Sequence, residues 1–116
     1  MQECLFCKIA AGEIPATKVY EDEYLVAFND VNPQMPVHVL IVPKQHYANI
    51  GDNIPDQVMG HLFNTVKKVA ELTGIAQAGY RTIVNTGDDA QQSVHHIHVH
   101  VLGGAPMNSG SPAFDA

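Results

Sequence analysis

Apolar and polar residues alternate with a period of two in several short segments of the chain, which predicts a protein built mainly from β-strands. The clearest alternation runs through residues 93–104, where three histidines would lie on one face of a strand and three β-branched residues on the other. Other short segments rich in β-branched or aromatic residues are bounded by Gly, Pro, Asn or Asp. The predicted strands are 18–21, 24–28, 37–43, 80–85 and 93–104.

One longer segment has apolar residues at the spacing of an α-helix. Its apolar stripe consists of Val58, Leu62, Val66, Val69 and Thr73. Pro55 suits the first helical turn, and Gly74 ends the helix. Asp52 or Asn53 is positioned to cap it. A second, short helix is predicted over residues 4–11.

These elements predict one α+β domain with a five-stranded antiparallel sheet, one long helix and one short helix. Most connections are too short for the crossover that parallel strands require, so the strands are expected to be antiparallel. We place the domain at residues 1–104 and a C-terminal tail, rich in Gly, Pro and Ser, at residues 105–116. A chain of 116 residues is long enough for a single hydrophobic core.

The charge and composition exclude several classes of function. The net charge is −6 with only six Lys and Arg residues, so we expect no binding of nucleic-acid backbones. No segment approaches the ~20 consecutive apolar residues of a membrane span. The first residues lack the basic and apolar regions of a signal peptide. We therefore expect a cytoplasmic protein in which Cys4 and Cys7 stay reduced.

The histidines of residues 93–104 are the strongest candidates for chemistry. His96, His98 and His100 would project from one face of the strand, about 7 Å apart. Imidazole works as an acid, a base or a nucleophile near neutral pH. The residues alone leave three interpretations open: structural histidines on a polar face, a three-histidine catalytic metal site with a bound water, or nucleophilic attack by imidazole on phosphorus.

Residues 96–102, His-Ile-His-Val-His-Val-Leu, resemble the His-φ-His-φ-His-φ-φ signature of the histidine-triad (HIT) superfamily, in which φ is apolar. Further segments are similar to the family in the same order along the chain. They are 4–9, 12–16, 28–34, 36–44, 79–81, Asn85 and 92–94. The similarity covers nearly the whole chain up to Gly104 and favours the Hint branch, which consists of purine-nucleoside phosphoramidases.

The resemblance implies hydrolysis at the α-phosphorus of purine nucleoside 5′-phosphoramidates, or related AMP conjugates, through a nucleotidyl-histidine intermediate. His98 matches the family's nucleophile, and a neutral imidazole is able to displace an amine from phosphorus. His96 flanks it in the same catalytic row, and His100 and His38 match positions that orient it and stabilise charge. Ser93 matches the residue that hands a proton to the departing amine. This mechanism requires no metal.

A pocket for a purine nucleotide follows from the same resemblance. Asp30 matches a carboxylate that accepts hydrogen bonds from both ribose hydroxyls. The apolar residues that match the clamp around the base are Leu5, Phe6, Ile9, Phe28, Val31 and Leu40. The predicted nucleotide-binding set is completed by Asn85, Gln92, Ser93, His98 and His100. Plain core packing is an equally open interpretation of Ile9 and Leu40.

Cys4 and Cys7 form a Cys-x-x-Cys motif, which by itself indicates a redox pair or half of a zinc site. The sequence has no second cysteine pair, so a zinc site needs two more ligands, and histidine is the obvious source. The resemblance implies a closed, structural zinc site in which His46 and His96 complete the ligand set. Two inert thiols in a reduced environment are the alternative.

The resemblance also implies a homodimer with a continuous sheet, in contact through the strand after Gly79 and the long helix. Gln91 departs from the family pattern, because a glycine is usual at this place beside the phosphate-binding turn. Two alternative functions stay open: hydrolysis of dinucleoside polyphosphates by the same histidine chemistry, and non-catalytic nucleotide binding by an adaptor protein.

Overall fold

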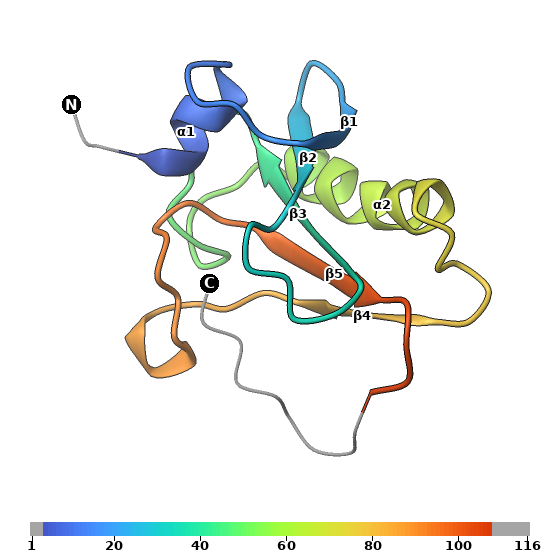
Figure 1. Ribbon diagram of the computed structural model, residues 1–116. Helices are drawn as coiled ribbons and strands as arrows, with labels where there is room; N and C mark the ends of the chain where they lie inside the picture. The colour runs from blue at the N-terminus through green and yellow to red at the C-terminus, as the bar shows by residue number, and fades with distance from the viewer. Residues whose placement is uncertain (1–3, 108–116) are drawn as a thin grey trace.

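The computed structural model describes residues 4–107, which form a five-stranded antiparallel sheet with a helix against each face (Figure 1). The strands are β1 (Lys18–Glu21), β2 (Leu25–Asn29), β3 (Val37–Pro43), β4 (Tyr80–Ile83) and β5 (Val99–Gly103). Their order across the sheet is β1-β2-β3-β5-β4, so β5 lies between β3 and the edge strand β4. The predicted α+β class and antiparallel sheet are confirmed. Most of the predicted tail, 108–116, lies outside the described residues.

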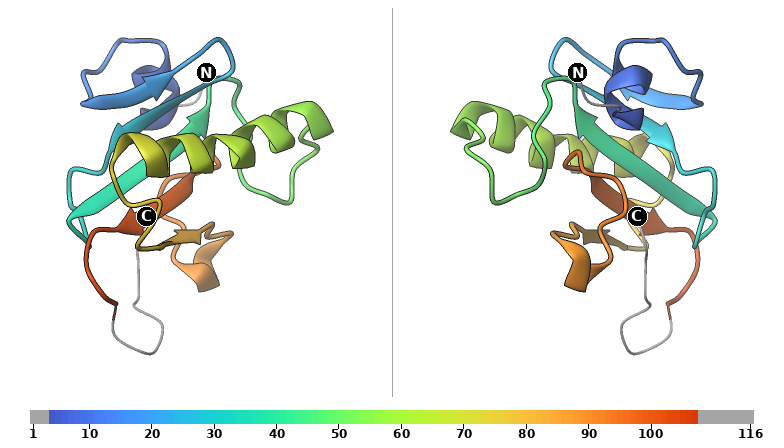
Figure 2. Two further views of the ribbon diagram at one scale, coloured as in Figure 1. Left: turned by 90° about the vertical axis from the view of Figure 1, so that its right-hand side faces the viewer. Right: turned by 90° about the vertical axis from the view of Figure 1, so that its left-hand side faces the viewer.

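The long helix α2 (Asp56–Leu72) crosses one face of the sheet and covers the larger apolar core (Figure 2). Its apolar stripe faces the sheet as predicted, although the end residues Val58 and Thr73 are only partly buried. The residues that pack between helix and sheet include Leu62, Val66, Val69, Ala70, Ile97, Val99 and Val101. Each fully buried Val or Leu stabilises the fold by about 1.5–3 kcal/mol, so this face anchors β5 firmly. Neither helix within residues 4–107 is long and apolar enough to cross a membrane.

The start of α2 differs from the prediction. Pro55 is the N-cap residue, and no side chain caps the helix. The Asp52 carboxylate instead accepts a hydrogen bond from the main-chain N–H of Ala48 at 2.6 Å. The prediction that Asp52 or Asn53 caps α2 is therefore wrong, because the Asp52 carboxylate closes the loop before the helix.

The short helix α1 (Leu5–Ala10) lies on the opposite face of the sheet from α2 (Figure 2). Cys4 is its N-cap, and its sulfur accepts from the main-chain N–H of Cys7 at 3.2 Å. Phe6 and Ile9 are its buried side chains. They pack against Val26, Phe28, Leu40 and Val42. A helix of six residues is marginal by itself, so its side-chain contacts decide whether it stays in place.

The strand that carries the histidines begins later than the alternation predicts. β5 pairs with β3 from Ile41 opposite Val99 onwards, so His96 and His98 precede the ladder. The side chains still alternate, since Ile97 packs beneath α2 while His96 and His98 are buried on the other side. The prediction of a strand from residue 93 is therefore wrong at its start, whereas the prediction of two opposite faces is confirmed.

Contacts with the loop after β3 hold the segment that precedes β5. The main-chain N–H of Ile97 donates to the carbonyl of Tyr47 at 2.7 Å. The buried Gln92 side chain donates to the carbonyl of Ala48 at 2.8 Å and accepts from the N–H of Gly87 at 2.9 Å. Side-chain periodicity carries no information about such partners, which explains the error in the predicted strand.

The turn between β4 and β5 contains a 3₁₀ helix (Asp88–Ala90) that the sequence did not predict. Gln91 follows it with φ 65° and ψ 33°, and is the one non-glycine residue within 4–107 with a positive φ. This left-handed conformation costs an L-residue other than glycine about 1–2 kcal/mol. A glycine, which the resemblance implies is usual at this position, would avoid that cost.

Replacement of Gln91 by glycine should raise the free energy of unfolding by about 0.5–1 kcal/mol, because the greater freedom of glycine in the unfolded chain offsets only part of the relieved strain. Urea unfolding followed by circular dichroism measures the change. The matched variant Gln45→Gly, at an exposed position without positive φ, should lower the free energy of unfolding. Equal losses in both variants would contradict the assigned strain.

Candidate active site and metal cluster

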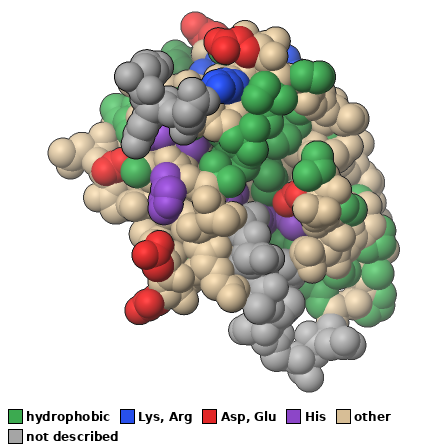
Figure 3. All heavy atoms as spheres, turned by 60° about the vertical axis from the view of Figure 1, so that its left-hand side comes forward, with side chains coloured by type: hydrophobic (Ala, Val, Ile, Leu, Met, Phe, Trp, Pro, Cys, Tyr) green, Lys and Arg blue, Asp and Glu red, His purple; other side chains and the backbone are tan. Residues whose placement is uncertain are grey.

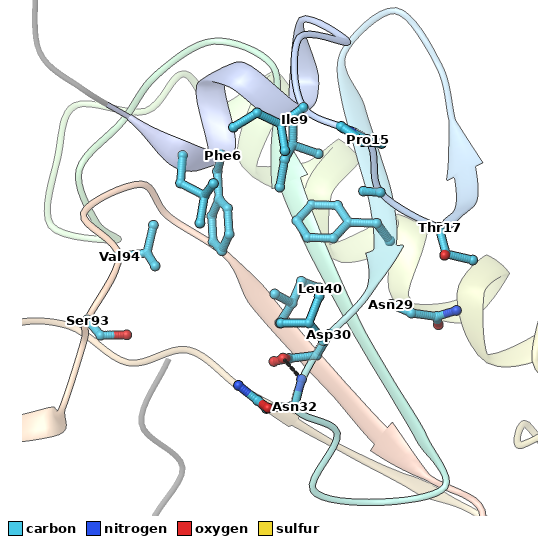
Figure 4. Close-up of a pocket in the computed structure, with 15 residues that line it drawn as sticks. Phe6, Ile9, Pro15, Thr17, Asn29, Asp30, Asn32, Leu40, Ser93 and Val94 are labelled. Atoms are coloured by element: carbon cyan, nitrogen blue, oxygen red, sulfur yellow. Dashed lines mark hydrogen bonds between the residues drawn. The ribbon is translucent and has the colours of Figure 1, made fainter.

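A cavity of about 730 Å³ lies on the α1 face of the sheet (Figure 4). Its volume is in the range of small-molecule binding sites. Side chains from α1 and the connection after it, from the end of β2 and the loop that follows, from the middle of β3, and from the segment before β5 surround it. The lining residues are Leu5, Phe6, Ile9, Ile14, Pro15, Ala16, Thr17, Phe28, Asn29, Asp30, Val31, Asn32, Leu40, Ser93 and Val94.

All six residues predicted to clamp a nucleobase line this cavity. Phe6 and Phe28 meet edge to face, with ring centroids 5.5 Å apart. Leu5 and Val31 are exposed at the rim, Val31 to 90%. The other four side chains are buried and also form the apolar core beneath α1. Core packing and cavity lining are therefore not alternatives for those four residues, because each does both.

Two of the predicted polar residues also line the cavity. Asp30 Oδ1 accepts from the main-chain N–H of Asn32 at 2.9 Å, and Asp30 Oδ2 lies 3.5 Å from His38 Nε2. Figure 4 shows the Ser93 hydroxyl pointing towards the cavity from the segment before β5, on the side opposite Asp30. A hydroxyl and a carboxylate thus face one another across the space available to a ligand.

Four residues of the predicted nucleotide-binding set, Asn85, Gln92, His98 and His100, are not among the lining residues, and both histidines are buried. Gln92 is 4% exposed, and its amide is hydrogen-bonded to main-chain groups of Gly87, Ala48 and Val94. Asn85 is half-buried after the end of β4. The predicted contact of these four residues with a nucleotide stays a prediction. In the structure, Gln92 helps to fix the segment that carries Ser93.

Several lining residues were not assigned from the sequence. They are Ile14, Pro15, Ala16, Thr17, Asn29, Asn32 and Val94. Residues 14–17 connect α1 to β1 and close one side of the cavity. The only signal for Ile14, Pro15 and Ala16 was the similarity of residues 12–16 to the family, which carried no assignment of a role, and Thr17 lay outside that segment.

The cavity lining contains no Lys or Arg among the described residues. On the face drawn in Figure 3, apolar side chains form a patch with histidines beside it, and the basic side chains in view lie at the upper edge. Recognition of a phosphate here would therefore depend on neutral donors such as imidazole and main-chain N–H groups.

His98 is buried, and the main chain fixes its tautomer. Its Nδ1 lies 2.7 Å from the carbonyl oxygen of His96. A carbonyl only accepts, so Nδ1 carries the proton, and the lone pair of the neutral ring is on Nε2. The ring of Phe6, from the cavity wall, packs edge-on against His98 at 5.0 Å between centroids. The tautomer of His98 is the one that a nucleophile acting through Nε2 requires.

A chain of hydrogen bonds assigns the tautomers of two further histidines. The main-chain N–H of Gln34 donates to His38 Nδ1 at 3.0 Å, so the proton of the neutral His38 ring is on Nε2. His38 Nε2 then donates to His100 Nδ1 at 2.8 Å, which places the His100 proton on Nε2. The rings of His98 and His100 lie 5.1 Å apart. The Nε2–H donor of His100 therefore belongs to the ring next to His98, whose Nε2 has the lone pair.

Two of the histidines are held in the neutral form by their surroundings. Burial lowers the pKa of His38; the Asp30 carboxylate opposes this effect and His98 adds to it. Burial also lowers the pKa of His96 to about 4, despite the hydrogen bond from its ring to the Pro43 carbonyl. Neutral rings are consistent with the tautomers given by the hydrogen bonds.

His96 connects the histidine row to a second group of side chains. Its Nδ1 lies 3.3 Å from Cys4 Sγ, 3.4 Å from Cys7 Sγ and 3.1 Å from His46 Nδ1. His46 Nδ1 is itself 3.4 Å and 3.3 Å from the two sulfurs. A tetrahedral Cys₂His₂ zinc site has edges of about 3.3–3.8 Å, so these five distances match it within a few tenths of an ångström. The His96 Nε2–H donates to the Pro43 carbonyl, which leaves the Nδ1 lone pair for a metal.

We call Cys4, Cys7, His46 and His96 the Cys/His cluster. Its protonation behaviour also favours a bound cation. Both cysteines are free thiols. Burial raises the pKa of Cys7 to about 11, with the neighbouring Cys4 acting in the same direction. Two adjacent thiolates are therefore unfavourable unless a cation compensates their charge, as a metal ion does. The predicted ligand set is brought together and is able to hold a metal.

An antiparallel sheet with buried histidines beside an apolar cavity defines this protein as one with a HIT-type fold. Residues 11–107 match the family model of the HIT domain, and the chain belongs to the HIT family. The purine nucleoside phosphoramidase of Escherichia coli K12 is 42% identical over 108 residues, which are 91% of this chain and 91% of that protein.

Among the similar solved structures, two HIT family hydrolases are matched over nearly their whole length. A HIT family hydrolase from Legionella pneumophila has a TM-score of 0.87 and 45% identity, and the match covers 92% of this chain and 97% of that one. A HIT family hydrolase from Clostridium thermocellum has a TM-score of 0.88 and 46% identity, with 95% and 97% covered. The family predicted from the sequence is confirmed. Cys4 and Cys7 precede the range that the family model matches.

Proposed function

We propose that the protein hydrolyses the P–N bond of purine nucleoside 5′-phosphoramidates, or of related AMP conjugates, through a nucleotidyl intermediate on His98. The observation that carries this proposal is the hydrogen bond from His98 Nδ1 to the His96 carbonyl, which leaves a lone pair on Nε2. The relative from Escherichia coli that is named purine nucleoside phosphoramidase supports the substrate class. HIT family hydrolases among the similar structures support hydrolysis.

In the first step, His98 Nε2 attacks the α-phosphorus and the P–N bond to the amine breaks. Ser93, which lines the cavity, donates a proton to the departing nitrogen. The new P–N bond gives a nucleotidyl-imidazolium whose positive ring is a good leaving group. In the second step, water attacks phosphorus, the bond to His98 breaks, and AMP leaves with the transferred oxygen. The excess proton of the water returns to the serine oxygen.

The surrounding groups would stabilise the charge that develops on phosphate oxygens. The His100 Nε2–H is a donor because the chain of hydrogen bonds from Gln34 through His38 fixes its tautomer. Neutral donors that are held in place before the reaction stabilise such charge without reorganising. The base would occupy the apolar cavity around Phe6, and the ribose hydroxyls would donate to Asp30.

The experiment that tests the function is hydrolysis of adenosine 5′-phosphoramidate linked to a fluorogenic amine. Release of AMP and the amine together, with a nucleotidyl-enzyme detected by mass spectrometry at short times, would support the proposal. AMP binding without turnover would favour a nucleotide-binding adaptor. Faster cleavage of a dinucleoside polyphosphate would favour that class of substrate instead.

We also propose that the Cys/His cluster binds Zn²⁺ as a structural ion. The ion would compensate the charge of two thiolates and link α1, the loop after β3 and His96. The cluster needs thiols rather than a disulfide, which is consistent with a reducing location such as the cytoplasm. Protein purified without a histidine tag should contain close to one zinc per chain by ICP mass spectrometry. Less than about 0.2 zinc per chain would contradict the site, since closed thiolate sites bind zinc tightly.

We infer further that two copies associate through β4. Within residues 4–107, β4 pairs only with β5, so its outer edge is available to a second strand. Tyr80 on this strand is 39% exposed. A pair of such edges would give one continuous sheet. Size-exclusion chromatography with light scattering should report about twice the mass of one chain, and a stable monomer would refute the dimer.

A further inference from the structure

We propose that the metal ion of the Cys/His cluster positions the imidazole of His98, by holding Phe6 and the His96 main chain against it. This inference rests on the proposed function in giving His98 the role of nucleophile. It goes beyond a structural ion, because it makes the geometry of the reacting ring depend on whether the cluster is occupied.

The need for such a device follows from where His98 lies in the fold. β5 begins at Val99, so His98 lies before the first pair of residues in the β3–β5 register, Ile41 opposite Val99. A nucleophile has to be held within about 0.5 Å of its productive position. Contacts other than the sheet must therefore help to fix the segment that carries it.

Three of those contacts lead directly to the Cys/His cluster. The carbonyl that accepts from His98 Nδ1 belongs to His96, which is itself a cluster residue. The ring that packs edge-on against His98 belongs to Phe6, which lies between Cys4 and Cys7. The carbonyl that holds Ile97 belongs to Tyr47, next to His46.

Without a bound ion, only side-chain packing and weak polar contacts would hold α1, His46 and His96 together. α1 has six residues and two buried side chains, so the packing of Phe6 and Ile9 against β2 and β3 would have to hold this short helix. The thiols and imidazoles of the cluster would then be joined by sulfur–nitrogen contacts of 3.3–3.4 Å and by the 3.1 Å contact between His46 Nδ1 and His96 Nδ1. Four metal–ligand bonds would replace those contacts and clamp α1, the loop after β3 and His96 to one point.

Through Phe6, the Cys/His cluster would also affect the shape of the cavity. Its buried ring touches both His98 and Phe28, and it is part of the cavity wall. A shift of α1 would therefore move the nucleophile and the apolar wall together. Phe6 is a positioning residue in this account.

The experiment compares zinc-loaded protein with the same protein stripped by a chelator. Long-range ¹H–¹⁵N spectra of ¹⁵N-histidine-labelled protein report the tautomer of each ring, and a His98→Gln variant assigns the His98 signal. We expect one sharp Nδ1-protonated His98 signal with zinc, and a shifted or broadened signal without it. The kcat for the phosphoramidate should fall about tenfold or more on stripping, because small misplacements of a reacting group are costly.

Reloading with Cd²⁺ separates positioning from direct metal chemistry. A positioning ion should restore both the His98 signal and kcat to within about twofold of the zinc value. A kcat that follows the Lewis acidity of the ion would overturn the proposal. So would stripped, folded protein whose His98 signal and kcat are unchanged.

A variant keeps the proposal testable even if stripped protein unfolds. Phe6→Leu with zinc bound should shift the His98 signal and lower kcat about tenfold. The matched control is Phe63→Leu, since Phe63 is an exposed residue of α2 outside the site. Equal behaviour of the two variants would overturn the role of Phe6. If zinc-loaded wild-type protein has no phosphoramidase activity, the proposed function fails, while the His98 signal still reports the coupling.

Discussion

Replacement of His98 by alanine should lower kcat for adenosine 5′-phosphoramidate by at least about 10³-fold, because the attacking Nε2 atom is removed. The cavity wall and Asp30 are unchanged in this variant, so AMP should bind with an affinity within about threefold of wild type. Steady-state kinetics and titration calorimetry measure the two quantities. His98→Gly should behave in the same way.

The matched control for that variant is His95→Ala. His95 is exposed and lies outside both the cavity lining and the Cys/His cluster. Its loss should leave kcat within about twofold of wild type. If His98→Ala kept more than about a tenth of the wild-type kcat, nucleophilic catalysis by this ring would be excluded. A nucleotidyl adduct that still formed in the variant would point to another nucleophile.

Much of this site could be predicted because its residues alternate along short segments. Ile97, Val99 and Val101 pack under α2 as the pattern of apolar positions indicated. The resemblance then assigned six apolar residues to one pocket, and all six line one cavity. The same resemblance grouped two cysteines with two distant histidines, and the structure brings them together. Predictions from side-chain alternation and from matched motifs therefore stay correct at residues 96–98, where the backbone is not part of a strand.

What could not be predicted are the partners of main-chain groups. The tautomer of His38 depends on the main-chain N–H of Gln34, and that of His98 on the carbonyl of His96. Every residue has these groups, so no residue type marks them in a sequence. The start of β5 at Val99 has the same origin, because Ile97 bonds to Tyr47 in a loop instead of to a strand.

The pair His38 and His100 differs from His96 in how its ring nitrogens are used. His38 and His100 share a hydrogen bond, so their facing nitrogens are committed to one proton. His96 instead directs a lone pair at two sulfurs and donates its proton to a main-chain carbonyl. The first arrangement suits charge stabilisation next to phosphate, and the second suits a metal ligand. Residue spacing in the sequence does not distinguish His96 from His100, since both belong to the same alternating row of histidines.

Asp30→Asn should weaken AMP binding by about 10- to 100-fold, because hydrogen bonds to a charged acceptor contribute about 1.5–3 kcal/mol. Asp30 lines the cavity, and a carboxylate accepts from both ribose hydroxyls, whereas an amide offers one accepting oxygen. The measurement is titration calorimetry with AMP and, in parallel, with 2′,3′-dideoxy-AMP. Wild-type protein should prefer AMP, and Asp30→Asn should lose most of that preference.

The comparison of the two ligands also separates contact with the ribose from an effect through His38. Asp30 Oδ2 lies 3.5 Å from His38 Nε2, so the substitution removes a negative charge beside the hydrogen bond from His38 to His100. A loss through the histidines would weaken both ligands equally, since both carry the same phosphate. A loss through the ribose would weaken AMP alone. Equal losses would therefore move Asp30 from nucleotide recognition to support of the catalytic histidines.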